Sequence, residues 1–413
     1  MKICIIGLGY IGIPTATMFA SKGYEVIGVD IRENVVKAIN SKHLPIEEKG
    51  LSELFSNHPF KASLTPEIAD VFIICVGTPT DENRKVDLTA VISASRDIAP
   101  YIKRNDLVIL ESTVPPGTTN DIVLPILEKE NLKAGVDFNL VHSPERVIPG
   151  NMLQELLSND RIMGGITREG AVRAKELYSS FVKGQIYVTD AKTAETAKLM
   201  ENTFRTVNIA LANEVAMISE TLGINAWEVI ELANKHPRVN IHSPGPGVGG
   251  HCIPVDPWFI VEKAPEESQL IRMSLEKNHS MPAFTVNRIF NILGGEKGFK
   301  ICLLGATYKA NTDDIRESPT FDIVRLLEKE NQVTLYDPHV NEYSEKDLYD
   351  CCESCDLLVL LVDHQQFKDI DYLKLHKIMK KPQLFDTKNF INRKSVTELG
   401  FSYHLLGDGS LKD

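Results

Sequence analysis

The chain has 413 residues, enough for two or three domains that each bury a core of their own. Its formal net charge of −11 at pH 7 argues against a general nucleic-acid binder, because a charge of this sign repels phosphate backbones. With 43% hydrophobic and 24% charged residues, the composition is that of an ordinary folded protein and excludes wholesale disorder.

The N-terminal end starts directly with a strand-like apolar run at residues 3–6, and no targeting segment precedes it. No apolar run reaches the roughly 18–20 residues that a membrane span needs. We therefore expect a cytoplasmic protein with neither a membrane nor a nucleic-acid partner.

Cys351, Cys352 and Cys355 form a cluster, but no second cysteine or histidine pair completes four zinc ligands, so no metal site is predicted.

Buried strands are predicted at both ends of the chain, because the apolar runs there do not alternate with polar residues. Helical periodicity fills the segments between them, as at residues 15–21. The predicted strands are 3–6, 25–29, 71–76, 107–110 and 138–141 in the first part, and 300–304, 333–336, 357–362 and 383–385 in the last third. Such alternation is typical of a doubly wound α/β domain.

The middle of the chain has a helical pattern. Residues 193–222 contain neither proline nor glycine and stop before Gly223, which predicts one long helix. A second helix is expected at 226–235, and the glycine- and proline-rich stretch 244–250 must be a loop. The fold class is α/β, with two Rossmann-like doubly wound domains joined by a helical central domain with one long helix. The predicted domain boundaries are 1–190, 191–290 and 291–413.

A dinucleotide fingerprint follows the first strand. Gly7, Gly9 and Gly12 have the G-x-G-x-x-G spacing, and Asp30 ends the next strand. Because Asp30 can accept hydrogen bonds from ribose hydroxyls and would repel a 2′-phosphate, NAD is favoured over NADP, although Arg32 is close by. FAD shares this fingerprint, and a tight strand–helix turn without a ligand is the bland alternative. Tyr10, Ile11 and Arg32 complete the candidate cofactor residues of this part of the chain.

Further candidates follow later strands, where ligands bind in such folds. Gly77 and Thr78 follow the third strand, Thr113 follows the fourth, and Glu145 with Arg146 follows the fifth. A single threonine or glutamate at a strand end is often only a cap or loop residue. The shared edge of the sheet favours a functional interpretation.

On the long helix, Lys198 and Asn202 are four residues apart and therefore share a face. An ammonium and an amide that point together could stabilise an oxyanion. Glu195 and Arg205 lie on roughly the same side. The alternative is therefore a solvated polar stripe, which is the usual state of an exposed helix face.

Cys252 differs from cysteines inside strands because it follows Gly249 and Gly250 in a loop and precedes Asp256 by four residues. Small neighbours would let a substrate carbon approach, and free backbone N–H groups can lower the pKa of a thiol. The alternative is an incidental loop cysteine.

The last domain lacks a second fingerprint, because Gly305 is not followed by further glycines at the required spacing. Lys309 and Arg316 lie in the loop after it, and such cations suit a phosphorylated ligand. We therefore expect a second nucleotide here and not a second NAD. A surface loop with paired charges is the alternative.

Taken together, these motifs resemble the UDP-glucose/GDP-mannose dehydrogenase family over nearly the whole chain. The motifs that carry the resemblance are the G-x-G-x-x-G start, Glu111-Ser112-Thr113 with Pro115-Pro116-Gly117, Ser143-Pro144-Glu145, Lys198 with Asn202, Gly249-Gly250-His251-Cys252, and Lys309 followed by Asp313-Asp314-Ile315-Arg316-Glu317-Ser318-Pro319.

The resemblance implies a role for each residue. Cys252 would be the nucleophile, and Lys198 with Asn202 would stabilise oxyanions. Asp256 and Thr113 would assist through water, and Glu145 would help to hydrolyse a thioester. Arg316 would reach the cofactor. The implied substrate residues are Glu145, Arg146, Lys198, Asn202, Arg238, Gly245, Gly249, Gly250, Lys309 and Lys388, with Arg238 lent across a dimer.

The implied activity is an NAD-dependent four-electron oxidation of the C6 hydroxyl of a UDP-hexose, in a homodimer or higher oligomer that supplies precursors of surface polysaccharides. The expected sugar is UDP-N-acetyl-D-mannosamine, with UDP-N-acetylglucosamine and UDP-glucose as alternatives. The first domain would bind NAD, the centre would carry the catalytic residues and the dimer contact, and the last would bind the UDP-sugar. Two rivals remain: a two-electron hydroxyacid dehydrogenase, and a non-catalytic module that binds NAD and nucleotide sugars.

Overall fold

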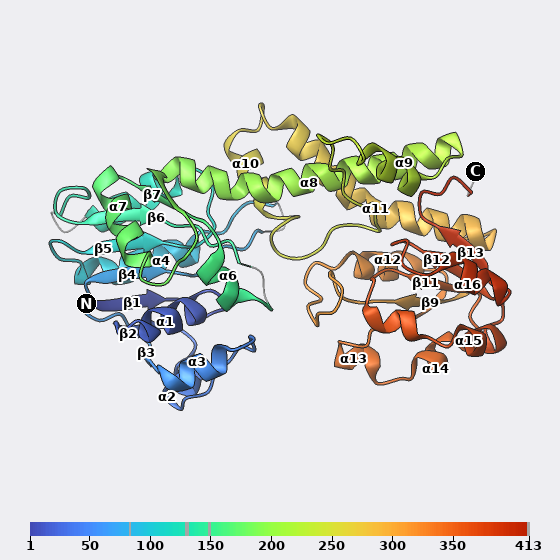
Figure 1. Cartoon of the computed structure of the whole chain (residues 1–413), viewed down its shortest axis with the longest axis horizontal. Coiled ribbons are helices and arrows are strands. Elements are labelled where there is room, and N and C mark those ends of the chain that lie inside the picture. Colours follow the sequence, from blue (N-terminus) through green and yellow to red (C-terminus); the bar gives the residue numbers. More distant parts are fainter. Residues whose placement is uncertain (82–83, 129–131, 148–149, 411–413) are drawn as a thin grey trace. The chain divides into compact units, whose positions relative to one another are not determined.

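The computed structural model describes residues 1–81, 84–128, 132–147 and 150–410. The chain forms two compact units, each with its own sheet and core (Figure 1). Unit 1 comprises Met1–Glu201 with Trp258–Pro265, and unit 2 comprises Asn202–Pro257 with Glu266–Asp413.

Unit 1 is built on an eight-stranded sheet of order β3-β2-β1-β4-β5-β6-β7-β8. Neighbouring strands are parallel except β6 and β7, which run antiparallel. The strands are β1 (Lys2–Ile6), β2 (Glu25–Val29), β3 (Lys61–Ser63), β4 (Val71–Ile74), β5 (Leu107–Leu110), β6 (Asn139–His142), β7 (Arg161–Gly165) and β8 (Ile186–Asp190). The sheet order reverses between β1 and β4, so their carboxyl ends flank the crevice where such folds bind ligands.

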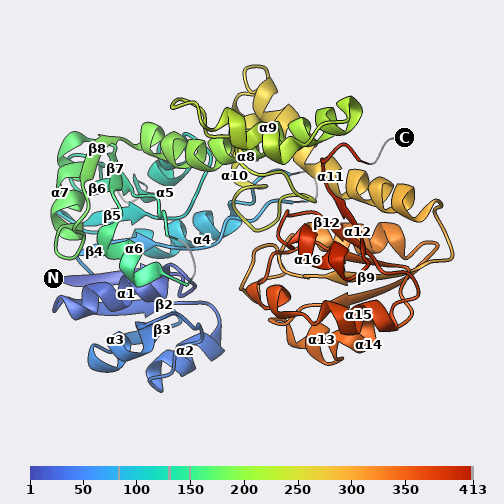
Figure 2. The same ribbon diagram turned by 45° about the vertical axis from the view of Figure 1, so that its right-hand side comes forward.

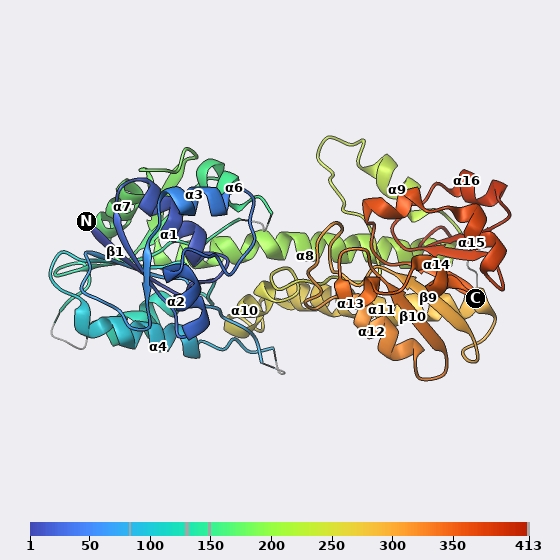
Figure 3. The same ribbon diagram turned by 90° about the horizontal axis from the view of Figure 1, so that it is seen from below.

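Helices cover both faces of this sheet. The helical elements are α1 (Gly12–Ser21), α2 (Glu33–Asn40), α3 (Leu51–Asn57), α4 (Thr89–Ile98), η1 (Ala99–Tyr101), η2 (Thr119–Val123), α5 (Leu124–Leu127), α6 (Met152–Ser158) and α7 (Arg168–Tyr178). Helices α1, α3, α6 and α7 pack on one face, and α4 with α5 packs on the other (Figure 3). Because both faces are covered, the central strands are apolar throughout.

The middle of the chain is helical, with α8 (Ala191–Leu222), α9 (Ala226–Ala233), α10 (Asp256–Lys263) and α11 (Gln269–Leu293). Figure 3 shows α8 as one unbroken helix. The Asn225 side chain caps α9 by accepting from the N–H groups of Trp227 and Glu228. Gly294 ends α11 in the left-handed conformation, which glycine adopts at little cost.

Unit 2 contains a five-stranded, fully parallel sheet of order β10-β9-β11-β12-β13. Its strands are β9 (Lys300–Leu304), β10 (Gln332–Tyr336), β11 (Leu357–Leu360), β12 (Gln383–Asp386) and β13 (Ser402–Leu405). Its further helical elements are α12 (Pro319–Leu327), α13 (Asn341–Ser344), α14 (Leu348–Cys352), η4 (Gln365–Asp369), α15 (Tyr372–Ile378) and α16 (Arg393–Glu398). Helices α11 and α12 cover one face, and α14, α15 and α16 cover the other (Figure 2).

The predicted fold class is confirmed, since each end of the chain forms a doubly wound sheet around the strands expected from the sequence. The long helix begins two residues earlier than predicted, at Ala191. Strands β3, β7, β8 and β13 were missed, because they are short or lie away from the sheet centre and lack a continuous apolar run. No helix among the described residues has the length and apolarity to cross a bilayer.

Candidate active site

The first turn of unit 1 is shaped for a dinucleotide. A Cβ on Gly7 would lie 2.7 Å from the Cys75 carbonyl oxygen, and one on Gly12 would lie 1.9 Å from the Gly7 oxygen, so both positions require glycine. A Cβ on Gly9 would meet no atom within 4 Å. The chain is therefore closely packed at its outer glycines and open at the middle one, Gly9, three residues before α1 begins at Gly12. This arrangement fits a pyrophosphate at a helix N-terminus, with exposed Tyr10 and half-buried Ile11 beside it.

Asp30 lies at the end of β2 and orders this turn. Its Oδ2 accepts from the Leu8 N–H at 2.9 Å, and its Oδ1 accepts from the Arg32 N–H at 2.9 Å. The Arg32 side chain also bonds both carboxylate oxygens. Burial alone would raise the pKa of Asp30, but the bonds from Arg32 and Leu8 outweigh it and lower that pKa. Asp30 is thus held as a carboxylate. The Arg32 guanidinium is paired with this carboxylate, which leaves less positive charge for a 2′-phosphate, so the site suits NAD better than NADP.

Two further predicted residues meet at the neighbouring strand ends. The Thr78 hydroxyl, after β4, donates to the Thr113 carbonyl at 2.6 Å, after β5. Ser112 ties the same segments together by donating to the Val76 carbonyl at 2.7 Å. Gly77 is exposed beside them. Unit 1 therefore brings Gly77, Thr78 and Thr113 together at one edge of the sheet.

A buried arginine holds two carboxylates at this edge. Arg161, the first residue of β7, donates to Glu145 and, at 3.3 Å, to Glu111. The Tyr178 hydroxyl and the Cys75 thiol also donate to Glu111, at 2.5 and 3.1 Å. Burial raises the pKa of Glu111, and the charge of Arg161 opposes that rise. The carboxylate of Glu145 therefore sits on a fixed, positively charged support.

Sequence reasoning missed Arg161 as part of this network. Its only sequence signal is a charged residue at the start of an apolar segment, which is more often solvated. Arg146, which was predicted, turns away from this group: its guanidinium bonds Glu201 on α8 at 2.7 and 3.1 Å and the Asp160 carbonyl at 3.0 Å.

The start of α8 is buried and not solvated. The Glu195 carboxylate accepts from the N–H groups of Gly117 and Thr119 at 2.5 and 2.7 Å, which caps the loop before η2. Lys198 is only 7% exposed, whereas Arg205 is exposed. The solvated-stripe alternative is therefore wrong for Glu195 and Lys198, because the helix packs that face against the sheet domain.

In unit 2, α8 holds the loop that carries Cys252. The Asn202 amide donates to the Asp256 carboxylate at 2.6 Å, and the Thr206 hydroxyl donates to the Ile253 carbonyl at 2.7 Å. The Asp256 N–H donates to the Cys252 carbonyl at 2.8 Å at the start of α10. Cys252 itself is half-buried. The incidental-loop alternative thus loses support, because the thiol lies in a tightly anchored, accessible turn.

The glycines before Cys252 pack on Tyr308, a residue that sequence reasoning did not single out. A Cβ on Gly250 would lie 2.8 Å from the Tyr308 ring, and one on Gly249 would lie 2.6 Å from the Tyr308 Cβ. The Gly250 N–H donates to the Arg316 carbonyl at 3.1 Å. Burial raises the pKa of Tyr308, and the nearby Asp314 adds to this rise.

The other predicted substrate residues of unit 2 are spread around this loop. A Cβ on Gly245 would lie 3.2 Å from the Lys388 ammonium, so these two are neighbours. Burial lowers the pKa of Lys388, while Asp363 and Asp386 oppose this. Lys309 is exposed, and the Arg316 guanidinium pairs with Asp314 at 2.6 Å. Arg238 is exposed after α9, and its backbone N–H donates to the His236 ring at 3.3 Å.

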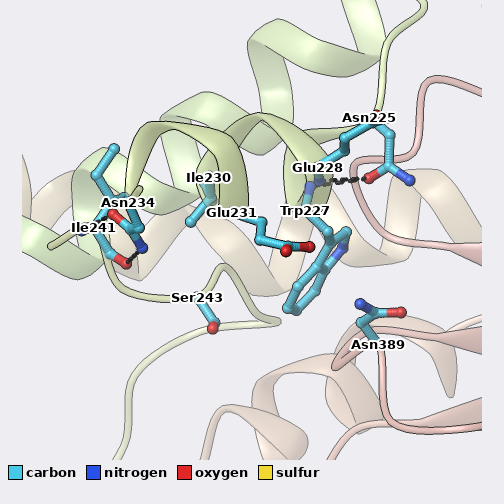
Figure 4. Close-up of a pocket in the computed structure, with 9 residues that line it drawn as sticks. All are labelled: Asn225, Trp227, Glu228, Ile230, Glu231, Asn234, Ile241, Ser243 and Asn389. Carbon is cyan, nitrogen blue, oxygen red and sulfur yellow. Dashed lines mark hydrogen bonds between the residues drawn. The ribbon is translucent and has the colours of Figure 1, made fainter. Parts of the chain in front are cut away.

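A cavity of about 450 Å³ lies beside α9 (Figure 4). Figure 4 shows the Trp227 ring and the Glu231 carboxylate on one side and Asn389 facing them. Asn389 directly follows the substrate candidate Lys388, and Ser243 lies two residues before Gly245. None of the predicted site residues lines this cavity. No group of three or more His, Cys, Asp and Glu residues in the described ranges is placed to hold a metal ion.

The chain matches known proteins over nearly its whole length. Residues 1–182 match the NAD binding domain of the UDP-glucose/GDP-mannose dehydrogenase family, residues 192–280 its central domain and residues 302–393 its UDP binding domain. A UDP-N-acetyl-D-mannosamine dehydrogenase of Methanocaldococcus jannaschii is 48% identical over 99% of this chain and 97% of the relative. An NDP-N-acetyl-D-galactosaminuronic acid dehydrogenase of Ralstonia solanacearum is 44% identical over 89% of this chain and 92% of its own.

Solved structures agree with the sequence relatives. The structure of the UDP-D-ManNAc dehydrogenase of Pyrococcus horikoshii superposes with a TM-score of 0.92 at 43% identity, covering 99% of this chain and all of the other. The two proteins therefore share one fold over nearly the whole chain.

Proposed function

Because this chain belongs to the UDP-glucose/GDP-mannose dehydrogenase family, and is thus an NAD-dependent dehydrogenase, we propose that it oxidises UDP-N-acetyl-D-mannosamine at C6 to the uronate. The relatives that carry this substrate in their names support the choice of sugar. The observation that carries the proposal is the anchored loop around Cys252, where a half-buried thiol follows two glycines that pack closely on Tyr308.

NAD, when bound, accepts hydride from the C6 carbon, and Gly7–Gly12 with Asp30 would hold it. The thiolate of Cys252 then adds to the C6 aldehyde, forming a carbon–sulfur bond and an oxyanion. Lys198 and Asn202 donate hydrogen bonds to that oxyanion, and Asp256 orients the Asn202 amide. After the second oxidation the sugar remains attached to Cys252 as a thioester.

Hydrolysis completes the reaction. Glu145 takes a proton from a water molecule, whose oxygen attacks the thioester carbon, and the carbon–sulfur bond breaks to release the carboxylate and the Cys252 thiol. Arg161 keeps Glu145 in place for this step. The UDP group would be held by Gly245–Gly250, Lys309 and Lys388, so remote binding energy keeps C6 in position between the two oxidations.

We further propose a homodimer formed through α8. Its exposed apolar side chains recur at intervals of four and seven residues, which places them on one stripe. They are Met200, Phe204, Leu211, Ile218 and Leu222. In such a dimer, Arg238 would contribute to the substrate site of the partner subunit. A role in polysaccharide precursor supply and a cytoplasmic location remain predictions, as do the domain boundaries at 190 and 290.

The test is a count of NADH. Purified enzyme is given excess NAD⁺ and a limiting amount of each UDP-sugar: N-acetylmannosamine, N-acetylglucosamine, N-acetylgalactosamine and glucose. Two NADH per UDP-N-acetylmannosamine, with the highest kcat/KM in the panel, are expected. One NADH per sugar would favour the two-electron rival, and none with any sugar would favour the binding module. The Ralstonia relative makes the galactosamine sugar the main competitor.

A further inference from the structure

Three buried polar side chains connect the two ends of the Cys252 loop. Thr206 and Asn213 lie on α8, and Asn278 lies on α11. Their exposed fractions are 1%, 0% and 5%. Polar groups this well buried are normally hydrogen-bonded, and the partners of these three show which segments they hold in place.

In this network, the donor and the acceptor of every hydrogen bond are determined. The Gly245 N–H donates to Asn213 Oδ1 at 3.0 Å, and Asn213 Nδ2 donates to Asn278 Oδ1 at 2.9 Å. Asn278 Nδ2 then donates to the Thr206 carbonyl at 3.0 Å. Because an N–H can only donate and a carbonyl can only accept, the two ends determine the orientation of both amides.

The Thr206 side chain extends the network to the far end of the loop. Its hydroxyl lies 2.7 Å from the Ile253 carbonyl and 3.0 Å from the Asn202 carbonyl. Ile253 is next to Cys252, and Gly245 is next to Lys388 in space. The loop between Gly245 and Ile253 is therefore anchored at both ends by one continuous path.

We propose that Asn213, Asn278 and Thr206 form a positioning relay that sets the place of the Cys252 thiol relative to the loop that receives the substrate. This rests on the proposed roles of Cys252 and Gly245. Asn278 contacts neither end of the loop, yet it joins both. A small displacement of a nucleophile costs much of its rate, so a rigid, fully bonded support of this kind has a catalytic effect without touching the substrate.

The first test compares two threonines of α8. Thr206→Val removes the hydroxyl that reaches Ile253, and Thr206→Ser restores it. Thr221→Val is the matched control, since the Thr221 hydroxyl bonds only the Met217 carbonyl one turn back, at 3.2 Å, among the described residues. We measure alkylation of Cys252 by iodoacetamide, with Cys252→Ser correcting for the other thiols. A change of roughly tenfold is expected for Thr206→Val and little for Thr206→Ser or Thr221→Val.

The second test asks whether the two ends are coupled. Asn213 and Thr206 are seven residues apart, about 10 Å along the helix, and substitutions so far apart usually act independently. If the relay exists, Asn213→Ala and Thr206→Val together lower the alkylation rate much less than the product of their separate effects. In an Asn278→Ala background the coupling disappears. Amide exchange of residues 244–256 should rise in each single variant, with protection unchanged in unit 1.

Multiplicative effects in the double variant, or loop exchange unchanged by Asn278→Ala, would overturn the relay. These readouts need neither NAD nor a sugar. If the wild type fails to give two NADH but shows the coupling, the proposed function is wrong and the relay stands. The proposed function stands without the relay if kcat and the alkylation rate are unaffected by Asn278→Ala.

Discussion

A thiol does covalent catalysis only where a substrate can reach it. Four of the other cysteines, Cys4, Cys302, Cys352 and Cys355, are completely buried in apolar cores, where cysteine acts as a small hydrophobe. Cys252 is half-buried in a polar, glycine-bordered turn. The difference in surroundings, and not the residue type, is the reason to assign it the nucleophilic role.

Cys252→Ser should therefore lower steady-state turnover by about 10³-fold or more, because a serine hydroxyl is a far weaker nucleophile than a thiolate. Any residual activity should stop after the first oxidation, giving close to one NADH per sugar. Stopped-flow absorbance at 340 nm gives both the rate and the yield. An unchanged turnover number would rule out covalent catalysis by this residue.

Arg161 is the residue that compensates the carboxylates of Glu111 and Glu145 in unit 1. Removing it leaves Glu111 and Glu145 facing each other without a cation, and an uncompensated buried charge is costly. Arg161→Met should lower the free energy of unfolding of unit 1 by about 3–5 kcal/mol and abolish most activity. Urea denaturation measures the first effect.

The control for this prediction is Arg104→Met. Arg104 pairs with Asp137 at 3.2 Å, but its side chain is 79% exposed, so its loss should cost under about 1 kcal/mol. Equal losses in the two variants would mean that the Arg161 network contributes no more than a surface ion pair.

At the scale of elements, the central strands and the long helix could be predicted because each has a strong local pattern. β4 and β5 are continuous apolar runs, and α8 has no proline or glycine over its length. β7 could not be predicted, since only Ile162 and Met163 stand between Arg161 and two glycines, and in β8 the half-exposed edge residues interrupt any apolar run. Their place in the sheet follows from tertiary pairing.

The site was predictable where function imposes residue types at fixed spacing, as with Gly7–Gly12 and the residues around Cys252. It was not predictable where ordinary residues act through long-range contacts. Tyr308 packs on the Cys252 loop, and Asn278 supports that loop through Asn213 and Thr206. Both residues lie 20 or more positions away from the loop in the chain, and no local pattern marks them. Such partners are visible only once the fold brings them together.

The exposed apolar stripe of α8 predicts how the protein assembles. Leu211 and Ile218 are about half exposed and lie two turns apart on its apolar stripe. In a dimer formed through this stripe, Leu211→Glu with Ile218→Glu would place charges in an apolar contact, and the protein should become monomeric. Light scattering coupled to gel filtration measures the mass. A dimer that persists in the double variant would place the interface elsewhere.

At the scale of the whole molecule, stability should depend on pH through His142. This histidine ends β6 and is completely buried, and neither ring nitrogen has a well-formed hydrogen bond among the described residues. Burial lowers the pKa of His142 to about 3, and the nearby Lys198 charge acts in the same direction. The folded state therefore keeps the ring neutral in a range where the unfolded chain would protonate it.

The sign of the effect follows from this difference. A free histidine has a pKa of about 6.5, so below that pH the unfolded state binds a proton that the folded state does not bind. The contribution of His142 to the free energy of unfolding is therefore fully present above about pH 6.5. It is lost as the pH falls toward about 3, at up to roughly 1.4 kcal/mol per pH unit. His142→Met, which cannot bind a proton, should flatten this fall.

Each unit contains one of the two tryptophans, Trp258 in unit 1 and Trp227 in unit 2, so unfolding of unit 1 can be followed separately. In a Trp227→Phe background, the fluorescence of Trp258 reports the urea midpoint of unit 1 at pH 7.5 and at pH 5. The midpoint should drop more between these values with His142 than with methionine at that position. If the two drops are equal, other groups carry the pH dependence, and the buried ring is then protonated or solvated in the folded protein as readily as in the unfolded chain.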